Sequence, residues 1–246
     1  MSDQPPDAAK PAASSDSLPA RLFGVIVSPR DTFARLVAQP KWFGAMALVT
    51  VLMAAGQFAF LSTPTGQEAM VDQQVHAAEL RGNVTQAQLD MFDKLAPYNK
   101  FIVGGSILIV GPIVSFIMAG ILFGVFNALA GGDASFKQVL AIVTHSGAVN
   151  VLQTLFVLPL NYLRASATSA TNLGVFVTSF LDDGSLLARF LGMIDLFIIW
   201  GLIVTAIGLA VLYRRKTAPI FWSLMGVYVV IALVIAGVMR AFSGGA

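Results

Sequence analysis

Residues 101–129, FIVGGSILIVGPIVSFIMAGILFGVFNAL, contain no charged side chain and exceed the roughly 20 apolar residues that a helix needs to cross a bilayer. The rest of the chain is similar, because 57% of its 246 residues are hydrophobic and only 11% are charged. Soluble domains carry about 25% charged residues, so a globule of this composition would lack a polar surface. The composition therefore predicts an all-α, polytopic membrane protein.

Four further segments have the length and hydropathy of a transmembrane helix: residues 43–61, 139–158, 190–213 and 219–239. Together with residues 101–129, they predict five transmembrane helices. Gly111-Pro112 lies inside the longest segment and predicts a kink or tilt, because proline removes a backbone hydrogen bond. Residues 173–181 are apolar but too short to cross, and we expect them to form an interfacial or packed helix.

The distribution of basic residues predicts the orientation of these helices. With the N-terminus inside, nine Lys and Arg lie on the cytoplasmic side and six lie outside, and Arg214-Arg215-Lys216 places three of the nine in one tight turn. This bias favours an N-in, C-out arrangement. Residues 62–100 then form an extracytoplasmic loop between the first and second spans.

Capping patterns predict helices in that loop and before the first span. Thr65-Gly-Gln-Glu68 and Thr85-Gln-Ala-Gln88 both match capping boxes, which predict loop helices at about residues 66–81 and 86–96. Before the first span, Ser28-Pro29 predicts the start of a short helix over residues 29–38. We expect this helix to lie at the membrane surface; the alternative is a solvated helical linker.

The two ends of the chain lie outside the membrane domain, which we place at residues 19–240. Residues 1–18 are rich in Pro, Ala, Ser and Asp, a composition typical of a disordered tail, here on the cytoplasmic side. Residues 241–246 form a short tail at the other end.

Polar side chains inside the predicted spans are candidates for function. In the third span His145, Asn150 and Gln153 lie on one helical face, and in the fourth Asp195 is the single carboxylate of an apolar run. As a functional cluster, these four residues would form a ligand or proton pathway. As structural groups, they would hydrogen-bond one helix to another. We expect Asp195 to bond with Asn150 or Gln153 and to be mainly architectural.

The residue types present exclude several kinds of chemistry. There is no cysteine, and only His76 and His145 could supply an imidazole, so we expect no metal site. His145 and Ser146 are neighbours, and on a helix they point about 100° apart, which prevents a nucleophile–base pair. Gly131-Gly132 is not followed by the Lys-Ser/Thr of a phosphate-binding loop. We therefore expect no catalytic residue, no cofactor and no nucleic-acid partner.

Four places in the chain resemble the Yip (Ypt-interacting protein) domain family: three motifs, and the short basic turn at Arg214-Arg215-Lys216 that leads into the fifth span. IVSPRDTFARL at residues 26–36 is similar to the family's Pro-x-x-Thr-Phe entry helix. LAGGDASFKQVLAIVTHSG at residues 129–147 resembles its Gly-Gly turn and the Ser-Phe-x-Gln opening of its third span. IDLFIIWGLIVTAIGL at residues 194–209 is similar to an Asp-x-Phe…Trp…Gly pattern in its fourth span. The matching positions are Pro29, Thr32, Phe33, Gly131, Gly132, Ser135, Phe136, Gln138 and Trp200.

The resemblance implies a five-span protein with a cytoplasmic N-terminus that acts as a non-enzymatic scaffold or adaptor, binding other membrane proteins, itself or lipid. Eukaryotic relatives bind prenylated Rab-type GTPases through their cytoplasmic parts. Here the N-terminal tail has only about forty residues, which argues against GTPase binding. The alanine-rich composition favours a prokaryotic member in a bacterial inner membrane; the alternative is a eukaryotic endomembrane.

A small transporter or channel-like protein is the other hypothesis, with Asp195 and His145 as its intramembrane groups. Transporters of this kind are typically built from repeats whose broken helices occupy corresponding positions. Five spans do not divide into equal halves, and only residues 101–129 contain an internal Gly-Pro. The scaffold is therefore the favoured interpretation.

Overall fold

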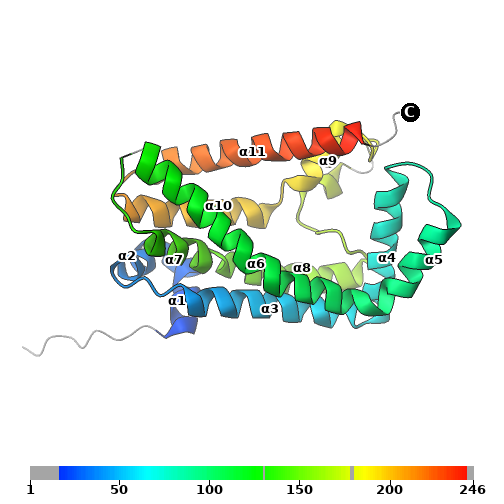
Figure 1. Cartoon of the computed structure of the whole chain (residues 1–246), viewed down its shortest axis with the longest axis horizontal. Helices are drawn as coiled ribbons and strands as arrows, with labels where there is room; N and C mark the ends of the chain where they lie inside the picture. Colours follow the sequence, from blue (N-terminus) through cyan, green and yellow to red (C-terminus); the bar gives the residue numbers. More distant parts are fainter. Residues whose placement is uncertain (1–16, 130, 178–179, 243–246) are drawn as a thin grey trace, which may run out of the picture.

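The long helices of the computed structural model run along one axis and form a bundle (Figure 1). The structure describes residues 17–129, 131–177 and 180–242, and within these ranges it contains helices and no β-strand. The lengthwise helices are α3 (Phe43–Leu61), α6 (Asn99–Phe123), α7 (Phe136–Ser146), α8 (Ala148–Leu163), α10 (Leu196–Leu212) and α11 (Thr217–Ala241).

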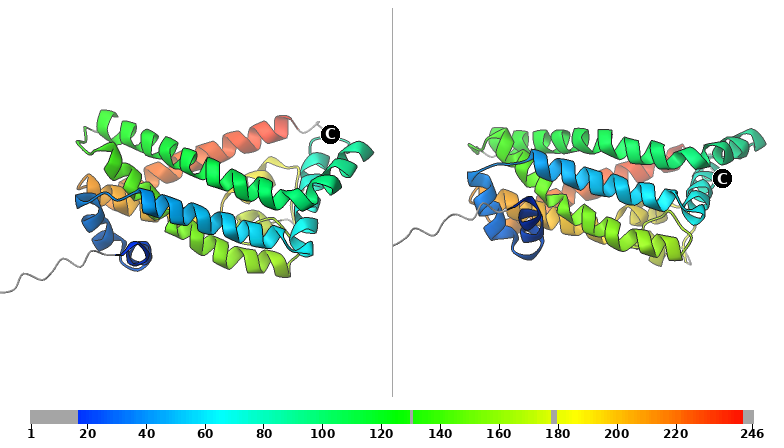
Figure 2. Two further views of the ribbon diagram at one scale, coloured as in Figure 1. Left: turned by 60° about the horizontal axis from the view of Figure 1, so that its bottom comes forward. Right: turned by 90° about the horizontal axis from the view of Figure 1, so that it is seen from below.

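Short helices lie at the two ends of this bundle. At one end are α1 (Leu18–Val27) and α2 (Pro29–Ala38), and at the other are α4 (Pro64–Glu79) and α5 (Gln86–Leu95), which extend beyond the long helices (Figure 2). The short helix α9 (Leu186–Met193) precedes α10. Single turns complete the chain: 3₁₀ helices at Ala96–Tyr98 and Leu173–Phe176, and a π-helix at Gly124–Leu129.

Four continuous helical segments are long and apolar enough to cross a membrane: Phe43–Leu61, Gln86–Ala128, Phe136–Leu163 and Thr217–Ala241. The apolar helix α10 is shorter, with 17 residues. Isoleucine, valine and phenylalanine side chains are exposed along α6 and α11, where lipid can cover them. These features are those of a polytopic membrane protein.

The main core lies where α2 and α7 pack against α10. Phe33 of α2 is 0% exposed, and the adjoining Leu36 is buried too. Gly208 makes this approach possible, because a Cβ there would lie 3.2 Å from Phe33 Cζ and 2.5 Å from Ile142 Cγ2. The bounds of α2 match the predicted residues 29–38. Its apolar face is covered by protein rather than left open to lipid, and its location at the membrane surface stays a prediction.

The helix predicted over residues 190–213 is divided into α9 and α10. Ile194 and Asp195 are extended, and Asp195 is the N-cap of α10. The third predicted span is also two successive helices that meet at Gly147. By contrast, α6 continues through Pro112 without a break and ends in the π-helix.

The loop helices occur where they were predicted, with one difference in capping. Thr85 and Gln88 form the expected capping box of α5. The helix α4 begins earlier than predicted, because Thr63 rather than Thr65 is its N-cap and Pro64 occupies its first turn.

Three other predictions concern segments that lie partly outside the described residues. Residues 173–181 contain only the 3₁₀ turn, and residues 178–179 lie outside the described ranges. Of the predicted disordered tail at residues 1–18, residues 1–16 also lie outside the described ranges. Residues 243–246 of the predicted short C-terminal tail lie outside them as well. Ser17 and Leu18, which the tail prediction included, cap and begin α1, a helix that was not predicted.

Candidate functional site

Asp195 lies at the junction of α9 and α10, where its carboxylate is 4% exposed and holds a loop against the bundle. Its Oδ1 accepts hydrogen bonds from Gln153 Nε2 at 3.2 Å and from the Phe197 backbone N–H at 2.8 Å. Its Oδ2 accepts from Ser169 Oγ at 2.7 Å and from Thr171 Oγ1 at 2.8 Å. A carboxylate offers about four lone-pair sites, and these four contacts occupy them.

The backbone reinforces the same junction. The Leu173 N–H donates to Ile194 O at 2.8 Å, and the Leu196 N–H donates to Thr171 O at 3.3 Å. The Tyr228 hydroxyl of α11 donates to Met193 O at the end of α9. Asp195 therefore joins the loop after α8, the break before α10 and the α8 side chain of Gln153.

The other members of the predicted polar cluster do not meet Asp195. Gln153 is the predicted partner that does, whereas Asn150 lines a separate groove. His145 is fully buried in α7, with its Nδ1 2.9 Å from Ala141 O. Its Nε2 is buried and has no hydrogen-bond partner among the residues that the structure describes. The four residues therefore lie in three separate places: Asp195 with Gln153, Asn150 in the groove, and His145 inside the bundle. The structure does not bring them together as one pathway.

The family-like motif residues gather instead at the end of the bundle formed by α1 and α2. Pro29 is in the first turn of α2. Thr32 is buried against α1, where a Cβ on Gly24 would lie 2.5 Å from Thr32 Oγ1. Phe33 lies in the core. The three residues of the entry motif, Pro29, Thr32 and Phe33, therefore share one face of α2.

The Gly-Gly motif makes a tight return between α6 and α7. Gly131 has φ +68°, in the left-handed region that glycine adopts without strain. Gly132 packs on the ring of Tyr213, because a Cβ there would lie 2.5 Å from Tyr213 Cε1. The Gly132 N–H donates to Phe126 O at 2.9 Å. Both glycines are therefore required by the path of the loop.

Ser135 and Gln138 start α7 and link it to α2. They form a capping box, in which Gln138 Oε1 accepts from the Ser135 N–H at 2.8 Å. The Gln138 amide donates to Val37 O near the end of α2 at 2.9 Å. The neighbouring Phe136 stacks on Phe116 of α6 with ring centroids 6.3 Å apart.

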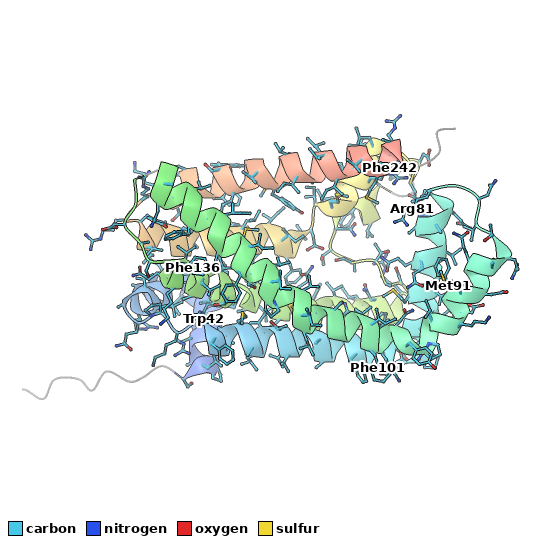
Figure 3. The ribbon with its side chains drawn as sticks, viewed as in Figure 1. Trp42, Arg81, Met91, Phe101, Phe136 and Phe242 are labelled. Carbon is cyan, nitrogen blue, oxygen red and sulfur yellow. The ribbon has the colours of Figure 1, made fainter. Side chains whose placement is uncertain are left out.

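The last motif position, Trp200 of α10, packs against the main core and lies 5.9 Å from the Phe197 ring. Figure 3 places Phe136 near Trp42 and the α2 end, whereas Arg81, Met91, Phe101 and Phe242 lie at the opposite end.

Two residues that the sequence did not single out complete this end. The Tyr213 hydroxyl donates to Asn127 Oδ1 at 2.8 Å, and Asn127 Nδ2 donates to Ala134 O at 2.6 Å. The Phe126 and Tyr213 rings stack with centroids 5.0 Å apart. The sequence signal that could have identified Asn127 is that it is a lone amide in the apolar end of the second span, where a buried amide needs a hydrogen-bond partner.

These contacts frame a hollow of about 460 Å³, which we call the polar cup. Its lining is Val37, Gly131, Gly132, Asp133, Ala134, Gln138, Val211, Leu212, Tyr213, Arg214 and Arg215. Arg214 is exposed, and its side chain makes no hydrogen bond or ion pair with the described residues. The cup therefore offers a free cation beside hydrogen-bonding groups, a suitable surface for an acidic or polar partner segment.

Arg214 also adopts an unusual backbone conformation. With φ +51° it is one of two non-glycine residues with positive φ in the described ranges, the other being Ala165. It follows Tyr213, the C-cap of α10, and the next N–H, that of Arg215, donates to Ala210 O at 2.9 Å. Glycine is the usual residue at such a helix end, and an L-residue there costs about 1–2 kcal/mol.

The described residues contain no group of three or more His, Cys, Asp or Glu that could hold a metal ion. The protonatable side chains that line the cup are Asp133, Tyr213, Arg214 and Arg215.

The chain is similar to known proteins over most of its length. The chain is 26% identical over 229 residues to "Membrane protein YknW" of Bacillus subtilis (strain 168), a match that covers 91% of this chain and 89% of that protein. No solved structure matches. The family model described as the Yip1 domain matches residues 23–239, which include all three motifs and both sides of the polar cup. The chain therefore belongs to the Yip1 domain family.

Proposed function

We propose that this protein is a non-enzymatic scaffold of the bacterial inner membrane that binds the cytoplasmic segment of another membrane protein in its polar cup. The observation that carries the proposal is the free Arg214 guanidinium, which is held in a strained backbone conformation at the rim of the cup. The Yip1 family is not known as an enzyme family. Its bacterial relative is named only as a membrane protein, in keeping with a non-catalytic role.

The proposal places the cup in the cytoplasm. Basic residues are concentrated at the α2 end: Arg30, Arg35, Lys41, Lys137, Arg214, Arg215 and Lys216. Such an excess favours the cytoplasmic side. The 17 residues of α10, about 25 Å long, are at the lower limit for a transmembrane helix. With α10 as the fourth of five spans, the chain crosses the membrane an odd number of times. Asp195 then lies at the extracytoplasmic boundary of the inner membrane rather than within its hydrocarbon.

The orientation can be tested with reporters fused after Ala246. We expect a reporter that functions only outside the cytoplasm to be active there, and one that functions only in the cytoplasm to be inactive. The matched control is the same pair of reporters fused before Met1, for which the activities should be reversed. If the same reporter of the pair were active at both ends, the chain would cross an even number of times, and α10 would be the helix that fails to cross.

Transport is the less favoured function, since its two proposed intramembrane groups do not form one pathway. The Asp195 carboxylate already accepts four hydrogen bonds from the protein. His145 lies in a different part of the bundle, packed within α7. Proton or ion exchange at Asp195 would first have to break this set of contacts.

The scaffold proposal can be tested by exchanging Arg214 for glycine. Arg214→Gly removes the guanidinium but favours the positive φ, so it should leave stability unchanged or raise it by about 1 kcal/mol. Loss of a charged hydrogen bond to a partner should lower its recovery about tenfold. The measurement is a mild-detergent pull-down of the whole protein, followed by quantitative mass spectrometry.

Ala165→Gly is the matched control, because it relieves the same backbone conformation at φ +47° away from the cup. It should retain every recurrent partner at the wild-type level. The proposal would be wrong if no protein were recovered reproducibly, or if Arg214→Gly kept its partners while remaining folded.

A further inference from the structure

A second hollow lies between the long helices, separate from the polar cup, and we call it the bilayer groove. It has a volume of about 540 Å³ and is formed by α3, α6, the α7–α8 junction and α10. Figure 1 shows α6 crossing the bundle obliquely over this region. Several lining side chains, among them Val110 and Val114 of α6 and Ile198 of α10, are exposed on the lipid-facing surface. The groove is thus open to the bilayer.

The lining contains no charged residue and no histidine. Most of its hydroxyl groups are already satisfied within their own helices. Thr50 Oγ1 donates to Met46 O at 2.7 Å, Ser115 Oγ donates to Gly111 O at 2.9 Å, and Thr144 Oγ1 donates to Leu140 O at 2.9 Å. These groups need no external partner.

Three polar side chains in the groove differ. Ser146 is 6% exposed, and its hydroxyl has no hydrogen-bond partner in the described part of the chain. The Asn150 amide and the Thr205 hydroxyl, which are partly exposed there, also make no side-chain hydrogen bond with described residues. A polar group left unpaired in an apolar surrounding is destabilising. A ligand that hydrogen-bonds at this point would remove that cost.

The break between α7 and α8 explains why these groups are available. Ser146 is the last residue of α7, and Gly147 separates it from α8. Ser146 and Asn150 line the groove together with residues of α10, near the middle of the helical segment Phe136–Leu163. They therefore lie deep in the hydrocarbon, where an ionised headgroup is costly.

The size of the groove narrows the class of ligand. A transmembrane helix is 10–12 Å across and rises 5.4 Å per turn, so one turn alone occupies about 400–600 Å³. The groove could hold about one turn, which is too little for a helix from a partner. It is within the range of roughly 300–1,000 Å³ for small-molecule sites.

We propose that the bilayer groove binds a neutral lipid whose hydroxyl or carbonyl group reaches Asn150 and Ser146 from within the membrane. The acyl chains remain along the apolar walls and in the surrounding bilayer. This site is independent of the proposed scaffold function, because none of its lining residues belongs to the polar cup.

Two probes that differ by one phosphate test the proposal. The whole protein in phosphatidylcholine nanodiscs is irradiated with a diacylglycerol carrying a photoactivatable acyl chain, or with the phosphatidic acid that has the same chains. We expect diacylglycerol to label α6 and α10 about tenfold more strongly, and unlabelled diacylglycerol to compete. Equal labelling by the two probes would overturn the proposal, since the groove would then be general lipid contact.

Gly201→Phe fills the groove, and its matched control is Gly226→Phe on α11. A Cβ at either glycine meets no atom within 4 Å, so neither backbone position forbids a side chain. Labelling by diacylglycerol should fall about tenfold in Gly201→Phe and stay unchanged in Gly226→Phe. Asn150→Leu, which keeps the side-chain size, should abolish the preference for diacylglycerol if Gly201→Phe does not fold. Wild-type labelling in a folded Gly201→Phe, or an unchanged preference in Asn150→Leu, would overturn the proposal.

Discussion

Replacing Phe33 by alanine should lower the free energy of unfolding by about 3–5 kcal/mol, the usual cost of removing a buried phenylalanine ring. Phe33 is 0% exposed and lies in the core shared by α2, α7 and α10. The cavity cannot close easily, because Gly208 brings the α10 backbone against the ring. Phe33→Asp should be more harmful still, since it would bury an unpaired carboxylate. Unfolding in mixed micelles of increasing denaturing detergent measures both.

The control is Phe23→Ala on the adjoining helix α1, where the ring is 68% exposed. It removes the same atoms but should change the free energy of unfolding by less than about 1 kcal/mol. If Phe33→Ala behaved like Phe23→Ala, then α2 would rest on lipid rather than in the protein core.

The contrast between the bounds of α2 and its location shows what the sequence could predict. Ser28-Pro29 marks the start of the helix, and the alternation of Phe33 and Leu36 with basic residues defines an apolar face. Periodicity identifies which face of a helix is apolar. It does not show whether lipid or protein covers that face, because similar residues suit both surroundings. Gly208, which follows Phe33 by 175 residues in the chain, is what allows α10 to cover it.

The polar cup illustrates a second limit. Its glycine turn, the Ser-Phe-x-Gln stretch that opens α7 and its basic turn were each recognisable as local motifs. Their assembly depends on non-local contacts, such as the Gln138 amide on Val37 O and the Tyr213 hydroxyl on Asn127. No local pattern specifies which carbonyl or amide a side chain will reach across the bundle.

The break before α10 was missed for a physical reason. An aspartate that precedes an apolar helical run is a typical N-cap, but the residues before Asp195 are also apolar, so the run looked continuous. The hydroxyl-rich stretch at residues 166–171 supplied two of its partners. A prediction based on hydropathy has no means of distinguishing a buried cap from a charge inside a span.

Replacing Asp195 by leucine should lower the free energy of unfolding by about 3 kcal/mol or more. The change leaves the Ser169, Thr171 and Gln153 donors without their acceptor, and each buried donor left unsatisfied costs about 1–3 kcal/mol, although the hydroxyls can rotate toward other acceptors. It also removes the N-cap of α10, worth about 1 kcal/mol. The measurement is thermal unfolding in detergent, with Asp93→Leu on the exposed surface of α5 as the control, which should change little.

Asp195→Asn separates the architecture of this site from its charge. An asparagine can keep its oxygen toward Phe197 N–H and Gln153 while its amide nitrogen donates to the two hydroxyl groups, which can accept as well as donate. Asparagine is also as good an N-cap as aspartate, so only the charge-assisted part of the bonding is lost, about 1 kcal/mol. We therefore expect Asp195→Asn to fold and to retain the partners recovered with the wild-type protein. If it kept its thermal stability and its expression level but lost those partners, the negative charge itself would be required, and exchange of an ion or proton at Asp195 would replace the architectural role.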